Sequence, residues 1–327
     1  MKITPTAVTT ASQLTRGTFI CLTATIIWST TAIFIRYLTV NYGMPPLVLA
    51  FWRDAFVFLG LAFIFAVSTP KRFRLERRHL PFMILYGFIL AIFNAIWTIS
   101  VKLNGAAIST VLVFSSAIYT VFLGWQIFNE HIGVVKILGS LVALVGLILV
   151  SGAYDPTAWQ LNAAGIIIGL ISGITFSLYS LMGRACSYRL IDPWTTLFYI
   201  FGFAMVFLFI FNLAPGWITG GAGVSGLFWL GDAWIGWLIL LLLSIGPTIG
   251  GYGLYAVSLT YLPASLANLI ATFEPAMTAI LAYFLLSERF SLLEILGGML
   301  ILGSVIALRL IEGRAIRRFA INQAVAD

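Results

Sequence analysis

The chain has 327 residues, of which 61% are hydrophobic and only 9% are charged, and its mean hydropathy is +1.05. Soluble domains carry about 25% charged residues, so this composition excludes a soluble globular protein. The net charge of +7 comes from basic residues clustered in short loops, where they orient membrane proteins, so we expect no nucleic-acid partner. Cys21 and Cys186 both fall inside apolar stretches and have no metal-type spacing, so neither a disulfide framework nor a metal site is expected.

Apolar windows of the ~20 residues that cross a ~30 Å hydrocarbon core recur along the whole chain. They predict ten transmembrane helices at residues 17–39, 45–68, 80–102, 105–128, 132–152, 161–184, 192–214, 234–258, 263–286 and 290–312. The expected fold class is an all-α, polytopic membrane protein, with the lipid bilayer as a partner. The first apolar run has full spanning length and no small-residue cleavage site, which favours a retained helix over a signal peptide.

The basic residues predict the orientation of these helices. Ten spans place both termini on one side of the membrane, and most of the 18 Lys and Arg residues fall in loops or tails on that side. The exceptions are Arg36, Arg53, Lys102 and Arg289. By the positive-inside rule, we expect a multi-pass protein of the inner or plasma membrane with both termini in the cytoplasm.

The chain also contains an internal repeat. Residues 17–36 align with residues 165–184 at an offset of 148, and residues 129–139 align with residues 287–297 at an offset of 158. We interpret them as two diverged five-helix units. The predicted boundaries are a tail at 1–15, a first repeat at 16–154, a second repeat at 155–312 and a tail at 313–327.

Because five is an odd number, the second unit starts on the opposite face of the membrane, so the two halves are inverted copies. Inverted repeats are typical of secondary transporters, whose substrate site lies near the midplane between the repeats. We therefore expect alternating access around a central cavity lined by helices one, three, four, six, eight and nine. The fifth and tenth helices are more uniformly apolar and are expected at the periphery.

Three stretches resemble a known family. They are "FEPAMTAILAYFLLSERFSLLEILGGMLILGSVIAL" (273–308), "IIWSTTAIFIR" (26–36) and "PLVLAFWRDA" (46–55). Together they resemble the ten-helix transporters of the drug/metabolite transporter superfamily, whose halves are called EamA domains. The first half departs from the pattern, because Ser116 and Ala117 stand where the second half has Glu274 and Pro275. The resemblance implies a carrier of small organic metabolites, often an exporter of amino acids or related compounds, and does not fix the substrate.

Glu274 is the strongest single candidate for a functional residue. Counting ~1.5 Å per residue from Pro263 places its carboxylate ~16 Å into the membrane, close to the midplane. A carboxylate at that depth is costly and is a functional candidate by default. It could bind a substrate ammonium group or carry a coupling proton. The structural alternative is an ion pair with Arg53, which lies at a similar depth in helix two.

Polar and aromatic residues near mid-span are further candidates for substrate binding. With Glu274, the predicted set is Trp28, Asn94, Trp97, Ser116, Tyr119, Ser177, Tyr252 and Tyr255. The Gly- and Pro-rich stretch 246–255 predicts a kink or partial unwinding of helix eight. The alternative for the small and polar residues is helix packing, which uses the same residue types.

Two other classes of function remain as alternatives. An intramembrane enzyme needs catalytic groups, but the sequence has no HExxH or GxSxG motif, and its two histidines, His79 and His131, fall in predicted loops. A channel needs a ring of charges along a pore, and one acid in one repeat gives no ring. We therefore expect a transporter without enzymatic activity or cofactor, acting in export on an amino acid or a related amphipathic compound. The sequence gives no indication of the oligomeric state.

Overall fold

A computed structural model describes residues 11–129, 133–156, 163–213, 222–274, 276–277, 291–293 and 295–307. Its first helical elements are α1 (Ala11–Trp28), α2 (Thr31–Tyr42), α3 (Pro46–Ser68), η1 (Pro70–Phe73), η2 (Arg77–His79), α4 (Leu80–Phe114), α5 (Ser116–Phe128) and α6 (Val134–Val150). They are followed by α7 (Ala163–Tyr188), α8 (Pro193–Asn212), α9 (Trp234–Leu243), η4 (Ser244–Tyr252), α10 (Gly253–Ser258), α11 (Ala264–Ala271) and a last helix, Ile295–Ala307. These ranges contain no strand, and the all-α fold class is confirmed.

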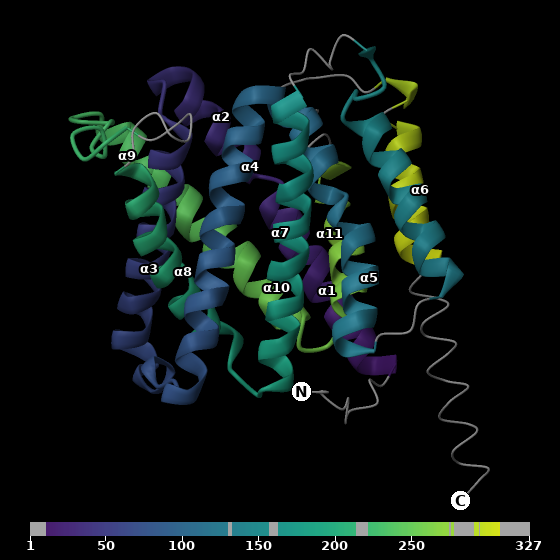
Figure 1. The fold of residues 1–327 in the computed structure, drawn as a ribbon, viewed down its shortest axis with the longest axis horizontal. Coiled ribbons are helices and arrows are strands. Elements are labelled where there is room, and N and C mark those ends of the chain that lie inside the picture. Colours follow the sequence, from purple (N-terminus) through teal and green to yellow (C-terminus); the bar gives the residue numbers. More distant parts are fainter. Residues whose placement is uncertain are drawn as a thin grey trace, which may run out of the picture.

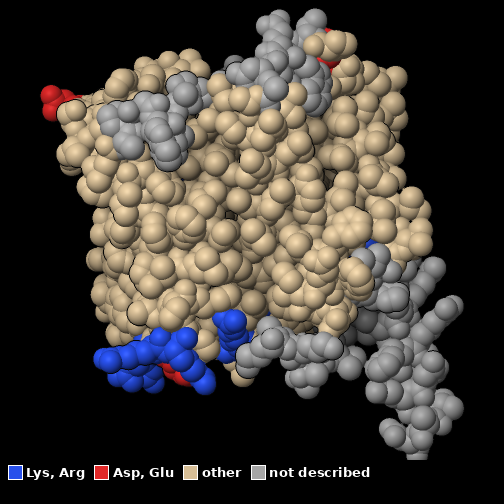
Figure 2. Space-filling view, in the orientation of Figure 1, with Lys and Arg blue, Asp and Glu red and all other residues tan. Residues whose placement is uncertain are grey.

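The bundle has the surface of a membrane protein. In the described part of the chain, seven helical stretches are long and apolar enough to cross a bilayer, and α6 and Ile295–Ala307 are shorter apolar helices. The helices run side by side (Figure 1). Large apolar side chains such as Phe63, Val134 and Trp234 are 70%, 71% and 69% exposed. The face seen in Figure 2 is almost free of charge between its two ends, and its Lys and Arg gather at the lower end. Such a surface is suited to lipid.

The first predicted span is a broken helix in the structure. α1 ends at Trp28 and α2 begins at Thr31. Between them, Ser29 Oγ donates to the carbonyl oxygen of Ile26 at 2.6 Å, and Thr30 Oγ1 donates to the carbonyl three residues before it at 2.8 Å. Hydroxyl side chains that bond to the preceding turn compete with the helical ladder. The Ser-Thr pair therefore marks an interruption near the middle of the span.

All residues of α4 have helical backbone conformation, so α4 is one element where the sequence predicts two helices that meet near residues 102–105. Its axis is not straight, however. The Oγ atoms of Ser100 and Ser109 are only 2.9 Å apart. In a straight helix, residues nine positions apart are separated by about 14 Å along the axis. The chain therefore reverses direction between these two serines. The two antiparallel limbs that the sequence predicts are present, joined by a tight reversal.

The fourth helix of each repeat breaks at the same place. Ser115 separates α4 from α5, and a turn at Thr272 and Phe273 follows α11. The offset of 158 residues between the repeats places Ser115 on Phe273. The break in the second repeat comes directly before Glu274. This shared position supports two copies of one five-helix unit.

The eighth predicted span contains a π-helical segment, η4, between α9 and α10. Within it, Thr248 Oγ1 donates to the carbonyl oxygen of Leu243 at 2.8 Å. Pro247 has no backbone N–H, so the regular ladder cannot pass through it unchanged. The distortion predicted for residues 246–255 is therefore present, in a form that keeps much of the backbone hydrogen-bonded.

The fifth and tenth helices lie at the edge of the bundle. α6 and Ile295–Ala307 run side by side at the right of Figure 1. They approach so closely that a Cβ atom on Gly146 would lie 2.6 Å from the carbonyl oxygen of Gly297. This glycine contact keeps the pair together without polar groups.

Candidate functional site

A cavity of about 70 Å³ lies at the centre of the bundle. It is lined in part by residues that the sequence predicts as functional: Trp28, Arg53, Trp97, Tyr252 and Glu274. The sequence missed the other lining residues, which are Thr31, Phe93, Val113, Phe114, Phe176 and Thr248. Phe176 is midway along the 26-residue α7, ~20 Å from either end at ~1.5 Å per residue, so the cavity is at mid-depth.

The interrupted helices meet at this cavity. Trp28 and Thr31 flank the break between α1 and α2, and Phe114 directly precedes the break between α4 and α5. Glu274 directly follows the turn after α11, and Thr248 belongs to the π-helical segment. Where a helix is interrupted, backbone groups leave the regular ladder and become available to a ligand, as they do at transporter sites.

A buried charged cluster holds one wall of the cavity. Arg53 and Asp54, consecutive on α3, are 2% and 0% exposed. Arg53 Nε is 3.3 Å from Asp54 Oδ1, and Asn94 Nδ2 of α4 donates to Asp54 Oδ2 at 2.8 Å. Adjacent helix residues do not normally face each other, but the long Arg53 side chain folds back onto its neighbour. The ion pair recorded for Arg53 is thus with Asp54, and the alternative pairing with Glu274 stays a prediction.

Two residues of the cavity wall each have a buried donor without a hydrogen-bond partner among the described residues. These donors are Nη2 of Arg53 and Nε1 of Trp28. Leaving a buried donor unsatisfied costs ~1–3 kcal/mol, and more for a charged group. The cavity therefore favours an occupant that brings hydrogen-bond acceptors.

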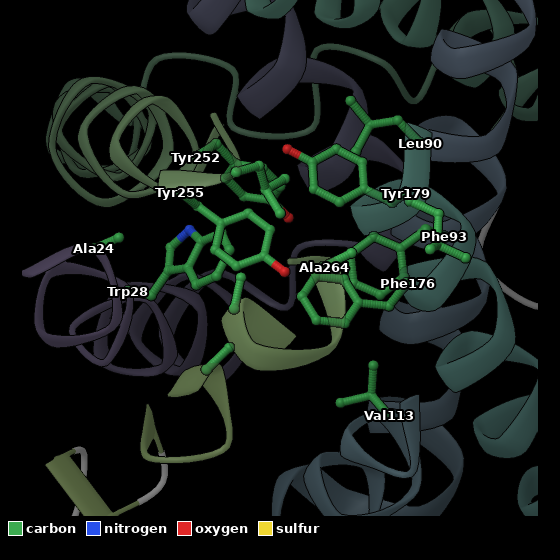
Figure 3. Close-up of a cluster of buried hydrophobic side chains, with 14 of the residues drawn as sticks. Ala24, Trp28, Leu90, Phe93, Val113, Phe176, Tyr179, Tyr252, Tyr255 and Ala264 are labelled. Atoms are coloured by element: carbon green, nitrogen blue, oxygen red, sulfur yellow. The ribbon is translucent and has the colours of Figure 1, made fainter. Parts of the chain in front are cut away.

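Aromatic rings separate the cavity from the end of the molecule that carries the basic loop. The ring centroid of Trp28 lies 4.9 Å from that of Tyr252 and 5.0 Å from that of Tyr255 (Figure 3). Tyr179 continues the layer, 5.6 Å from Tyr252 and 6.0 Å from Phe176. Because Tyr179 and Tyr255 are fully buried, this layer closes the basic end of the cavity.

Two of the predicted binding residues, Ser116 and Tyr255, belong to a second buried network. Ser116 Oγ donates to Asn268 Oδ1 at 2.9 Å. Asn268 Nδ2 donates to Ser180 Oγ at 3.3 Å, and Ser180 Oγ is 2.8 Å from the Tyr255 hydroxyl. The network ties α5, α7, α10 and α11 together, and its members do not line the cavity.

The remaining predicted residues also lie outside the lining. Ser177 accepts a hydrogen bond of 2.9 Å from Thr120, and Asn94 acts through Asp54. Tyr119 is partly exposed on α5 and is not part of the wall. Their roles in substrate binding stay predictions.

The sequence contains a signal for some of the site residues that were missed, namely polar residues inside apolar spans. Asp54 and Asn268 are polar residues inside apolar spans, which is a reason to expect a partner for each. Phe93, Phe114 and Phe176 carry no such signal, because a phenylalanine facing a cavity has the same local sequence as one facing lipid.

The family is shown by comparison with known proteins. The model of the EamA-like transporter family matches residues 15–152 and, a second time, residues 163–310. The chain belongs to the EamA-like transporter family. The two matches agree with a chain built from two repeats, and they confirm the family resemblance found in the sequence.

Similar proteins from bacteria and archaea are named as transporters. "Uncharacterized transporter YdfC" of Bacillus subtilis is 28% identical over 266 residues, which cover 80% of this chain and 81% of the relative. An "Uncharacterized transporter" of Archaeoglobus fulgidus is 24% identical, covering 86% and 92% of the two chains. "Uncharacterized inner membrane transporter YicL" of Salmonella typhimurium is 24% identical, covering 92% and 98%.

A solved structure shares the fold. One chain of known crystal structure matches 92% of this chain and 99% of its own length, with a TM-score of 0.72 and 17% identity. Together with the family, this makes the EamA-like protein a multi-pass membrane transporter of the drug/metabolite transporter type.

Proposed function

We propose that this EamA-like protein is a secondary transporter that exports an amino acid or a related amphipathic metabolite across the inner or plasma membrane by alternating access. The observation that supports this substrate class is the mid-depth cavity, whose wall combines Arg53, Glu274 and aromatic rings. A guanidinium suits a carboxylate and a carboxylate suits an ammonium group, while the rings suit an apolar side chain.

The size of the cavity supports a conformational step in the cycle. Ligand pockets usually measure about 300–1,000 Å³, whereas this cavity measures about 70 Å³. The helices must therefore move apart before a metabolite can enter. The interruptions beside Trp28, Phe114 and Glu274 are the places where such a hinge motion costs least, because the helical ladder is already broken there.

The charge distribution supports the proposed orientation. The loop of residues 70–79 carries five Lys and Arg residues, and it lies at the lower end of the bundle in Figure 2. If this end faces the cytoplasm, the aromatic layer closes the cytoplasmic side. A cysteine at Lys71 in a protein without Cys21 and Cys186 tests the orientation, since only a membrane-permeant maleimide should label it in intact cells.

Counterflow in liposomes tests the transport class. Purified protein is reconstituted with unlabelled L-leucine, L-methionine or L-phenylalanine inside, and uptake of the same radiolabelled compound is measured. A carrier gives saturable uptake that the internal substrate accelerates, whereas a channel gives flux without counterflow. Protein-free liposomes are the control. Unaccelerated, non-saturable flux would overturn the carrier proposal, and chemical conversion of the compound would indicate an enzyme.

Coupling to a proton is the second part of the proposal, and Glu274 is the group assigned to it. An intramembrane carboxylate that lines the cavity can change its protonation as the cavity is exposed to either side. An imposed pH gradient should therefore drive accumulation of the substrate in liposomes. Accumulation that is indifferent to the gradient would show facilitated diffusion instead.

A further inference from the structure

We propose that Arg53 and Trp28 form a carboxylate-binding subsite in the central cavity, so that the substrate must carry a free carboxylate group. This inference rests on the proposed transport function, because it assigns one end of the substrate to named atoms of the same site. The atoms are Arg53 Nη2 and Trp28 Nε1, two buried donors of residues that line the cavity, neither of which has a partner in the described part of the chain.

The Arg53 guanidinium is held in place before any ligand arrives. Its Nε is engaged by Asp54 at 3.3 Å, and Asp54 is held in turn by Asn94 at 2.8 Å. Since a guanidinium is planar, fixing Nε also fixes the plane in which Nη2 points. Nη2 itself is buried, so a ligand can reach this charged donor only when the cavity widens.

The Trp28 indole is fixed by packing. Its ring lies against Tyr252 and Tyr255, and Gly251 leaves the space that its edge occupies, since a Cβ atom there would lie 2.6 Å from Nε1. An indole N–H can only donate. The ligand group that satisfies both residues must therefore offer acceptor atoms, and a carboxylate offers two oxygens that can serve both donors.

The charges around the cavity restrict the ligand further. With Glu274 ionised, Arg53, Asp54 and Glu274 carry +1, −1 and −1, a sum of −1. A bare carboxylate would lower this sum to −2, whereas a molecule that also carries an ammonium group leaves it unchanged. The subsite therefore fits the carboxylate of a zwitterion better than that of a simple organic acid.

Matched ligands test the subsite directly. The probes are L-leucine, L-methionine and L-phenylalanine, each compared with its carboxamide, which keeps the ammonium group and side chain but lacks the carboxylate. Binding to the purified full-length protein in detergent is measured by calorimetry at millimolar concentrations. We expect at least one acid to bind about tenfold or more tightly than its amide, which corresponds to ~1.4 kcal/mol. In Arg53→Gln this preference should fall to about one.

The variants separate the subsite from general damage. Trp28→Phe keeps an aromatic ring but removes the donor, so it should reduce the acid preference without abolishing binding of the amide. Arg77→Gln, in an exposed loop, and Trp234→Phe, on the exposed surface, are controls that should keep the wild-type preference. If Arg53→Gln aggregates, Trp28→Phe carries the comparison, because it leaves the Arg53–Asp54 pair in place.

Each outcome is decisive. Equal binding of acid and amide, an acid preference that survives both site variants, or no binding of any of the three acids would overturn the subsite. Acid-selective binding without counterflow in liposomes would leave the subsite standing and remove the transporter proposal. Saturable counterflow of acid and amide alike would leave the transporter proposal standing and remove the subsite.

Discussion

Arg184 Nη1 donates a hydrogen bond of 2.7 Å to the carbonyl oxygen of Leu259. This bond ties the end of α7 to the residue that caps α10, on the basic side of the aromatic layer. Arg184 is buried, and its guanidinium carbon lies 4.7 Å from the centroid of the Tyr188 ring. A cation at the carboxyl end of a helix is stabilised by the helix dipole. The contact therefore joins the ends of α7 and α10 on the basic side of the aromatic layer.

Loss of this hydrogen bond should open the basic end more often. Arg184→Gln loses a charged hydrogen bond worth ~1.5–3 kcal/mol. Cys186, buried two residues further along α7, should then react roughly tenfold faster with a small maleimide. The rate is measured in a Cys21→Ala background. Arg77→Gln is the matched control, and an unchanged rate in Arg184→Gln would show that the bond does not hold the gate.

Neutralisation of Asp54 should destabilise the protein strongly. Asp54→Asn leaves the buried Arg53 charge without its counter-ion, and breaking a buried pair in this way costs ~3–5 kcal/mol. The measurement is the thermal unfolding midpoint in detergent. Asp232→Asn, at an exposed position, should leave the midpoint unchanged. Equal midpoints for the two variants would mean that the Arg53–Asp54–Asn94 cluster contributes little to folding.

Glu274→Gln should lower transport without preventing folding. The substitution keeps the size of the side chain at the cavity wall but removes the group that can bind an ammonium or carry a proton. We expect substrate counterflow in liposomes to fall by more than about tenfold, and the dependence of flux on pH to disappear. Glu76→Gln in the basic loop is the control. Near-normal flux with the wild-type pH profile would remove Glu274 from the mechanism.

Two glycines of the π-helical segment offer a paired test of the cavity wall. A Cβ atom on Gly251 would collide with the Trp28 indole, whereas a Cβ atom on Gly246 would meet nothing within 4 Å. Gly251→Ala should therefore displace the ring, weaken substrate binding and cost ~1–3 kcal/mol of stability by overpacking. Gly246→Ala should be neutral or slightly stabilising. Thermal unfolding and substrate binding are measured for both, and similar behaviour would contradict the packing of Trp28 on Gly251.

Features that depend on local chemistry could be predicted from the sequence. The membrane class, the repeat and the distortion at residues 246–255 follow from composition, spacing and the positions of glycine and proline. Glu274 could be placed at mid-depth because the rise of a helix is constant.

Features that depend on which helices meet could not be predicted in this way. The hydroxyls of Ser116 and Tyr255 bond in the network around Asn268, which lies 152 residues from Ser116, and no local pattern reveals that pairing. Their role in substrate binding stays a prediction. The Arg53–Asp54 pair depends on a side-chain conformation that the helical pattern argues against. The break between α1 and α2 is equally hidden, because Ser and Thr occur within unbroken membrane helices as well.

The matching interruptions in the two halves have an evolutionary consequence. Both copies inherited a joint in the fourth helix, but only the second has an acid beside it, while the first has Ser116. A synthetic chain made of two first halves would keep the interruption and lack the carboxylate of Glu274. Divergence of the two copies has thus left a hydroxyl beside the shared interruption in one half and a carboxylate beside it in the other.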